Sequence, residues 1–269
     1  MKKKWMMLGM SAVFSVGLLA GCGAEEDAGE QLVSFEIPTE GELGSAIAFP
    51  KGSELVEPFN EQLNELIESG KMDDLILKWF DAGEGSVETD DTTEGTERTN
   101  TLIMGTSADY PPYESIDLAT GEIIGFDVDI AKYITQELGY ELKIEDMDFN
   151  ALIPAMEAGR VDFVLAGMTP TEERKNNVNF SDIYYEATNL IVSKENANLS
   201  TLEDLEGLKV GVQLGSIQEE EAEELAAEYG FEVVKLNRIP EIMQELIAGR
   251  IDAILMEDTV AEGHLGAQQ

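Results

Sequence analysis

The sequence predicts an α/β protein made of two lobes of similar design. Strands and helices alternate along the segment from 101 to 257, and one five-residue corner occurs twice in that segment. A stretch rich in Gly, Thr, Ser and acids, residues 81–100, separates it from a shorter segment at 32–80 and is interpreted as a linker. Such alternation predicts mixed, mostly parallel sheets with helices on both faces.

The spacing of apolar residues marks each element of the longer segment in turn. We expect strands at 101–105, 140–147, 161–167, 189–193, 208–213, 231–236 and 251–257. We expect helices at 126–138, 150–158, 217–229 and 240–248. Ser200 with Glu203 predicts a capping box before a short helical turn.

The repeated corner is Ala-Gly-Arg-Val-Asp at 158–162 and Ala-Gly-Arg-Ile-Asp at 248–252. Each copy follows an apolar helix and opens an apolar strand. Helix–Gly–strand corners commonly look alike, so the repeat alone leaves coincidence open. Together with strand–helix sets on either side of Ser193, it indicates two similar lobes. Ligands of open α/β sheets sit beyond the carboxyl ends of the strands, so two facing lobes would form a cleft.

Composition excludes one class of partner. The chain has 269 residues and a formal net charge of −38, and 43% of its residues are hydrophobic. That length allows a sizeable core, whereas the negative surface repels phosphates, so no nucleic-acid binding is expected. Acids are spread along the whole chain, and we interpret them as a solvated surface suited to salty or alkaline surroundings.

The amino terminus predicts export. Three lysines at 2–4 precede an uncharged, mostly apolar run at 5–20, which is too short for a comfortable membrane span. The run ends in Leu-Ala-Gly-Cys at 19–22, which resembles a bacterial lipobox. This resemblance implies a signal peptide at 1–21, a lipid such as palmitate on Cys22 and a tether at 22–31. The alternative for Cys22, the only cysteine, is an ordinary buried thiol.

Five motifs of the longer segment occur together. They are GTSADYPPYE at 105–114, GFDVD at 125–129, AGMTPTEERK at 166–175, FSDIYY at 180–185 and LEGLKVGV at 205–212. Together they resemble the polar amino-acid-binding family of bacterial solute-binding proteins, the receptors of amino-acid ABC importers. The resemblance implies the periplasmic-binding-protein type II fold, in which two lobes enclose a ligand cleft.

The shorter segment resembles the same family out of order. AFPKGS at 48–53 and the helical stretch that ends in Lys-Trp-Phe at 78–80 are similar to the family's carboxyl end. The chain therefore looks circularly permuted, with the linker joining the usual ends. The resemblance assigns 50–80 with 101–192 to lobe 1 and 193–269 with 32–49 to lobe 2. A strand at 46–49 is expected to cross the hinge beside 189–193.

Two origins would explain this rotated order of the segments. A permuted single domain would be a monomer, and a flexible linker of this length reaches about 25 Å, enough to join two ends on one lobe. In the other case, the tail of one receptor copy precedes a second copy that lacks its tail. Residues 32–80 would then complete a neighbouring chain by swapping.

The resemblance assigns ligand contacts to the first lobe. Arg174 would bind the carboxylate of a free amino acid with two charge-assisted bonds, helped by Thr169 and Gly167. The alternative places Arg174 in a surface cluster with Lys175. Tyr110 and Phe149 would supply aromatic walls, although either ring could belong to the core instead.

In the second lobe, Glu257 occupies the position where the family usually has aspartate, and Asp258 follows it. Either acid could bind the ammonium, and Asp258 could instead be a helix N-cap. The start of the next helix would offer free N–H groups beside the ligand through Ser216, Ile217 and Gln218.

Side-chain specificity is weakly encoded. The three residues expected to contact the ligand's side chain are Ser107, Gln213 and Met256. None of them is charged, which favours a neutral ligand. Asp109 and Glu114 would reverse this preference if they face the cleft.

The expected function is an extracytoplasmic, lipid-anchored receptor that delivers a free amino acid to an ABC permease without catalysis, cofactor or metal. One alternative is an enzyme on the same fold, such as a prephenate- or arogenate-type dehydratase, because fold does not fix function. Another is a ligand-sensing module. The only histidine, His264, lies near the carboxyl end, and no nucleophile triad or metal-ligand spacing is present.

Overall fold

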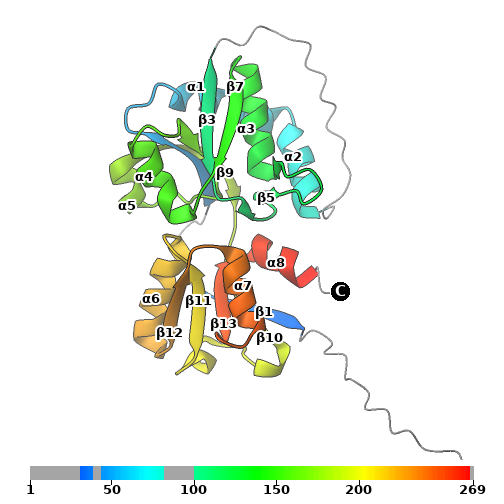
Figure 1. Ribbon diagram of the computed structural model, residues 1–269, viewed down its shortest axis with the longest axis vertical. Coiled ribbons are helices and arrows are strands. Elements are labelled where there is room, and N and C mark those ends of the chain that lie inside the picture. Colours follow the sequence, from blue (N-terminus) through cyan, green and yellow to red (C-terminus); the bar gives the residue numbers. More distant parts are fainter. Residues whose placement is uncertain (1–30, 39–43, 82–99, 267–269) are drawn as a thin grey trace, which may run out of the picture.

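The protein has two lobes, one above the other in Figure 1. This computed structural model describes residues 31–38, 44–81 and 100–266. Cys22, the signal peptide, the tether and most of the linker lie outside the described residues. Each lobe is built around one five-stranded sheet.

The sheet of lobe 1 has three parallel strands at one side and a reversed strand near the other. Its order is β7 (Glu141–Asp146), β3 (Thr101–Thr106), β8 (Phe163–Val164), β2 (Gly44–Pro50) and β9 (Val178–Glu186). β3 is parallel to both of its neighbours, whereas β2 is antiparallel to β8 and β9. Four strands therefore run one way and β2 runs the other.

The sheet of lobe 2 repeats this pattern. Its order is β12 (Glu232–Leu236), β11 (Lys209–Gln213), β13 (Ala253–Glu257), β10 (Asn189–Lys194) and β1 (Leu32–Glu36). β11 is parallel to both neighbours, and β10 is antiparallel to β13 and β1. The prediction of two similar α/β lobes with mixed sheets is confirmed.

The repeated corner occupies the same place in both lobes. At 2.7 Å, Ile103 N donates to the Asp162 carboxylate, and Asp162 N donates back to Ile103 O. Lys209 and Asp252 exchange the equivalent two bonds at 2.8 Å. In each lobe, the aspartate of the corner thereby holds the first residues of the central parallel strand in register.

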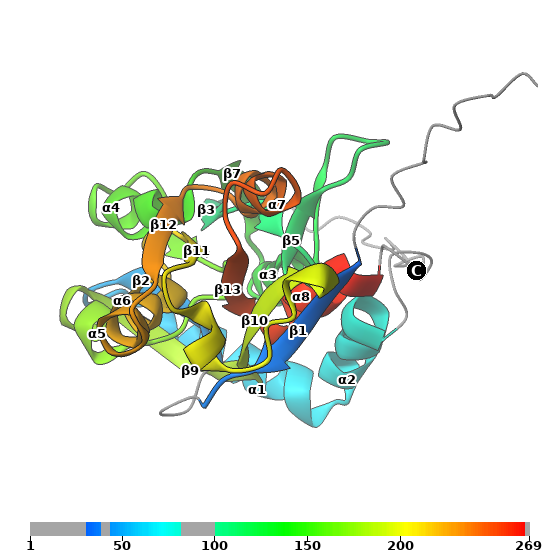
Figure 2. The same cartoon turned by 90° about the horizontal axis from the view of Figure 1, so that it is seen from below.

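Helices cover the sheets (Figures 1 and 2). Lobe 1 carries α1 (Val56–Glu68), α2 (Lys71–Ile76), a π-helical turn η1 (Leu77–Asp81), α3 (Phe126–Glu137), a 3-10 turn η2 (Phe149–Ala151), α4 (Leu152–Glu157) and α5 (Glu172–Asn177). A small sheet beside them contains β4 (Asp109–Tyr110), β5 (Glu114–Ile116) and β6 (Ile123–Ile124). Lobe 2 carries the 3-10 turns η3 (Glu195–Ala197) and η4 (Leu202–Leu205), then α6 (Ile217–Tyr229), α7 (Ile239–Ile247) and α8 (Asp258–Gly266).

The shorter segment completes both lobes. Its helix α1 packs against β9 and α3, and Phe59 from α1 meets Phe163 of β8 with ring centroids 5.0 Å apart. Phe49 of β2 stacks edge-on against Phe59 at 5.2 Å. These rings are fully buried, so residues 44–81 form part of the core of lobe 1.

The lobe boundaries differ from the expected ones. β2 lies in the sheet of lobe 1, although its residues up to 49 were expected in lobe 2. β10, expected up to residue 192 in lobe 1, lies in the sheet of lobe 2. The strand at 46–49 therefore pairs with β9, and β1 is the strand that pairs with β10. The fully apolar interior of β2 explains this, because it fills a central position that is buried on both faces.

Several local expectations also need correction. The capping box lies one residue later than predicted, with Thr201 as N-cap and Asp204 in place of Glu203. The Asp204 carboxylate accepts from Ser200 N and Thr201 N, both at 3.0 Å. The strand expected at 161–167 shrinks to two residues because the chain leaves the sheet after Val164. β9 and α8 are present in the structure but were not among the elements expected from the sequence.

A candidate ligand site between the lobes

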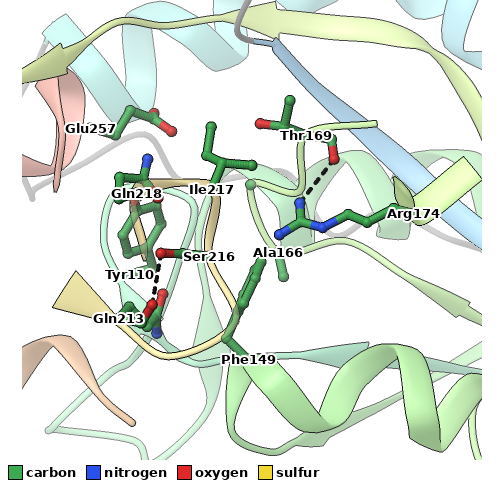
Figure 3. A pocket seen from close by; sticks show the side chains of 11 residues that line it. Tyr110, Phe149, Ala166, Thr169, Arg174, Gln213, Ser216, Ile217, Gln218 and Glu257 are labelled. Atoms are coloured by element: carbon green, nitrogen blue, oxygen red, sulfur yellow. Dashed lines mark hydrogen bonds between the residues drawn. The ribbon is translucent and has the colours of Figure 1, made fainter. Parts of the chain in front are cut away.

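A pocket lies between the lobes and draws its walls from both (Figure 3). Lobe 1 contributes Tyr110, Phe149, Ala166, Gly167, Thr169 and Arg174. Lobe 2 contributes Gln213, Ser216, Ile217, Gln218 and Glu257. The walls lie at or just beyond the carboxyl ends of β3, β7, β8, β11 and β13, as expected for ligand sites of α/β sheets.

Arg174 bridges the two lobes with its guanidinium. Thr171 caps the helix that carries it, accepting from Arg174 N at 3.2 Å. Nη1 donates to Thr169 O and Nη2 to Gly215 O of lobe 2, both at 2.9 Å. The guanidinium also lies over the Phe149 ring, 5.4 Å from its centroid. Burial lowers the pKa of Arg174 to about 10, so the group stays charged at neutral pH.

A buried carboxylate binds the backbone of the loop that carries Gly167. Asp127, at the start of α3, accepts from Gly167 N at 2.8 Å, and both of its oxygens accept from Tyr184 OH. Met168 O accepts from Ala46 N of β2 at 2.9 Å. Backbone atoms on either side of the loop are therefore held by groups from α3 and β2, which positions Thr169 at the pocket.

The start of α6 is held as rigidly in lobe 2. Ser216 caps the helix by accepting from Glu219 N at 3.2 Å and donates to Gln213 O at 2.7 Å (Figure 3). The amide nitrogen of Gln218 donates to Asn189 Oδ1, and that of Gln213 donates to Asn237 O. Each bond uses one of the two N–H groups of an amide, so the other N–H and the amide oxygen can meet a ligand.

Of the two candidate acids, Glu257 lines the pocket and Asp258 does not. Tyr113 OH and Thr259 Oγ1 both donate to Glu257 Oε1. Burial raises the pKa of Glu257 to about 7. Asp258 begins α8, where it accepts from Thr259 N and from Thr188 Oγ1 at 2.8 Å.

Four further residues considered as ligand readers lie outside the lining. Ser107 is buried and donates to Asp109 Oδ1 at 2.7 Å, which removes its hydroxyl from the pocket. Met256 belongs to the core, and Glu114 is fully buried. Asp109 is directed towards lobe 2, where it accepts from Ile239 N. Ala166 also lines the pocket; it begins the motif at 166–175 but was not named as a ligand contact.

Buried carboxyl groups gather behind the pocket. Burial raises the pKa of Asp127 to about 7. Burial, and then the charge of Asp127, raise the pKa of Glu114 well above its usual range. Within the described part of the chain, neither oxygen of Glu114 has a hydrogen-bond partner. Together with Glu257, these groups favour the protonated form in the folded protein.

This cluster predicts that stability falls as pH rises. The unfolded carboxyls titrate near pH 4, whereas Asp127 and Glu257 titrate near 7 when folded, so between those values the folded state binds more protons. We expect the thermal midpoint to fall from pH 5 to pH 8. Glu114→Gln, a neutral mimic, should flatten this slope, whereas Glu172→Gln on the exposed α5 should not. A midpoint that rises steadily over this range would contradict the assignment.

Two kinds of feature are missing from the part of the chain that the structure covers. Among residues 31–38, 44–81 and 100–266, no group of three or more His, Cys, Asp or Glu side chains could hold a metal ion. Within the same ranges, no helix combines the length and apolar character needed to cross a membrane.

Comparison with known proteins identifies the family. Bacterial extracellular solute-binding proteins, family 3, match residues 102–229. The arginine-binding extracellular protein ArtP of Bacillus subtilis is 53% identical over 163 residues, which are 61% of this chain and 63% of that protein. This chain thus spans less than two thirds of that relative's length.

Solved structures agree with this likeness. An ancestral arginine-binding protein bound to arginine has a TM-score of 0.61 and 43% identity, over 64% of this chain and 76% of that one. An ancestral amino acid-binding protein described as a precursor of cyclohexadienyl dehydratase has a TM-score of 0.59 and 31% identity, over 76% and 78% of the two chains. With its two-lobed fold and these relatives, the chain belongs to the family 3 extracellular solute-binding proteins.

Proposed function

We propose that this protein binds a free α-amino acid between its lobes and presents it to the permease of an ABC importer. One observation carries the proposal: a guanidinium and a carboxyl group line the same pocket from opposite lobes, Arg174 from lobe 1 and Glu257 from lobe 2. An α-amino acid carries the two complementary charges. Binding the amino acid would hold the lobes together and so favour the closed form of the protein. A permease could recognise that closed form.

The ligand's side chain would meet two amide groups, each with an oxygen that can accept a hydrogen bond. The amide oxygens of Gln213 and Gln218 are free of the bonds that hold their nitrogens. Acceptors suit a side chain that donates, such as a guanidinium or an amide. Two of the relatives named above are described as arginine-binding, and another similar structure is described as an ancestral arginine-binding protein bound to glutamine. We therefore propose arginine and glutamine as the first ligands to test.

Calorimetry against the twenty amino acids should find at least one binder that is not converted. Arg174→Ala should weaken that binding by roughly 2–5 kcal/mol, about thirty- to several-thousand-fold, because a desolvated carboxylate loses its partner. Arg160→Ala, an exposed arginine of the same lobe, is the matched control and should bind as the wild type does. Silence across the panel, combined with turnover of a prephenate-like acid, would favour the dehydratase instead.

We propose that the mature protein is anchored outside the cytoplasm through a lipid on Cys22. The support is the lipobox-like sequence at 19–22, since this region lies outside the described residues. A single acyl chain gives only weak, reversible membrane binding, so stable attachment through Cys22 would need more than one chain.

Cys22→Ser should move the protein from the membrane fraction to the soluble fraction after cell lysis, because the acylated sulfur is lost. The wild-type protein treated in parallel is the control. Retention of the variant in the membrane fraction would instead indicate an uncleaved signal helix.

We also propose that the chain is a circular permutant of its family. In support, β1 and β2 precede the family match at 102–229, yet they belong to the sheets of different lobes. The resemblance of 48–80 to the family's carboxyl end supports the same order. The connection would then run from Asp81 to Asn100 within one molecule.

Solution mass separates this proposal from swapping between neighbouring chains. Sedimentation of the purified protein at micromolar concentration should give a monomer, because the linker is long enough to close the fold within one chain. A stable dimer or a ladder of larger assemblies would contradict the permuted single domain and support exchange of residues 32–80.

A further inference from the structure

Arg238 lies at the contact between the lobes, outside the set of residues that line the pocket. It is the N-cap of α7 in lobe 2, and its side chain reaches into lobe 1. Nε donates to Asp148 Oδ1 at 2.7 Å, and Nη1 donates to Asp146 Oδ1 at 2.8 Å. Asp109 Oδ1 lies 3.6 Å from Nη1. One guanidinium thus meets three carboxylates of the opposite lobe.

Two more bonds reinforce the same junction. Asp109 Oδ2 accepts from Ile239 N at 2.8 Å, so a carboxylate of lobe 1 caps the first turn of a helix in lobe 2. Asn237 Nδ2 donates to Asp148 Oδ2 at 3.2 Å. Asp146 is itself held in place, because its Oδ1 also accepts from Ala108 N at 2.9 Å. The junction is a network of partly buried charges, which contributes more than an isolated surface pair.

Each part of this junction is next to a residue of the pocket. Asp109 precedes Tyr110, and Asp148 precedes Phe149 in the chain. In lobe 2, Asn237 O accepts from the amide of Gln213. Forming the junction therefore places two aromatic walls and one acceptor relative to each other, without any contact between Arg238 and the pocket.

We propose that Arg238 is an interlobe clasp, a positioning residue that keeps the cleft closed by protein contacts alone and so raises the affinity for the ligand. Without its cation, the three carboxylates of lobe 1 would lose the positive charge of lobe 2 that attracts them. Only the bonds from Ile239 N and Asn237 Nδ2 would still join them to lobe 2, which would favour separation of the lobes. Observed affinity scales with the fraction of protein already in the binding-competent shape. The effect on affinity rests on the proposed function, whereas the effect on shape does not.

The shape is tested without any ligand. Wild type, Arg238→Ala and Arg250→Ala are freed of bound molecules by unfolding and refolding, and their radii of gyration are measured by small-angle X-ray scattering. Arg250 is the matched control because its two 2.6 Å bonds to Glu245 stay within lobe 2. We expect a larger radius for Arg238→Ala and an unchanged one for Arg250→Ala. Equal radii for the two variants would overturn the clasp.

A second variant guards against a folding defect. The pair Asp146→Asn and Asp148→Asn preserves the shape of both side chains and removes the charges that Arg238 binds, so it should also enlarge the radius. A cooperative thermal unfolding transition would show that either variant is folded. If the doubly substituted protein is folded and as small as wild type, the clasp is overturned.

Affinity gives the functional readout. With an amino acid identified by calorimetry, Arg238→Ala should bind about 5- to 150-fold more weakly, the usual range of coupling between sites, and Arg250→Ala should match the wild type. Equal affinities for the two variants would also contradict the clasp. If the wild type binds none of the amino acids in calorimetry, the proposed function is contradicted. The radii of gyration would still test whether Arg238 keeps the lobes closed.

Discussion

The position of β2 between β8 and β9 is the constraint on which the rest of lobe 1 depends. Its backbone pairs with both neighbours, and its side chains from Ala46 to Phe49 are wholly buried. It also reaches the ligand site, since Ala46 N donates to the loop that carries Thr169. Without this strand, two sheet edges would lose their partners and the loop would lose a support. A segment at the start of the chain is therefore needed to build a pocket whose other walls come much later.

The charges of the cleft divide into two groups with different surroundings. Asp127 and Glu257 are buried, and burial raises the pKa of each to about 7. Asp146 and Asp148 lie at the partly exposed rim, where Arg238 compensates them. In a chain of net charge −38, cations at the cleft are few, and two arginines there each contact both lobes. In such an acidic protein, arginines therefore provide contacts between the lobes both at the pocket and at the rim.

Much of the fold and of the pocket was open to prediction because its signals are local. Helical spacing from Phe126 and the glycine corners marked the elements of both lobes, since burial of one face imposes a period on the chain. Arg174 and Glu257 were instead expected from the resemblance to the family, which covers the loop at 166–175 and the end of the strand at 251–257. Ten of the twelve ligand-site residues named from sequence line the pocket, and Ser107 and Asp258 do not.

The sequence by itself determined the α/β class, the two-lobed repeat and the family. Only the tertiary structure decided which lobe each hinge strand joins, because strand pairing depends on partners far along the chain: β2 meets β9, and β1 meets β10. It also decided that the Ser107 hydroxyl donates to Asp109 and does not line the pocket, and that Glu257 rather than Asp258 does line it. Arg238 and its carboxylates leave no local pattern, since about 90 to 130 positions separate them and charge attraction acts through space, not along the sequence.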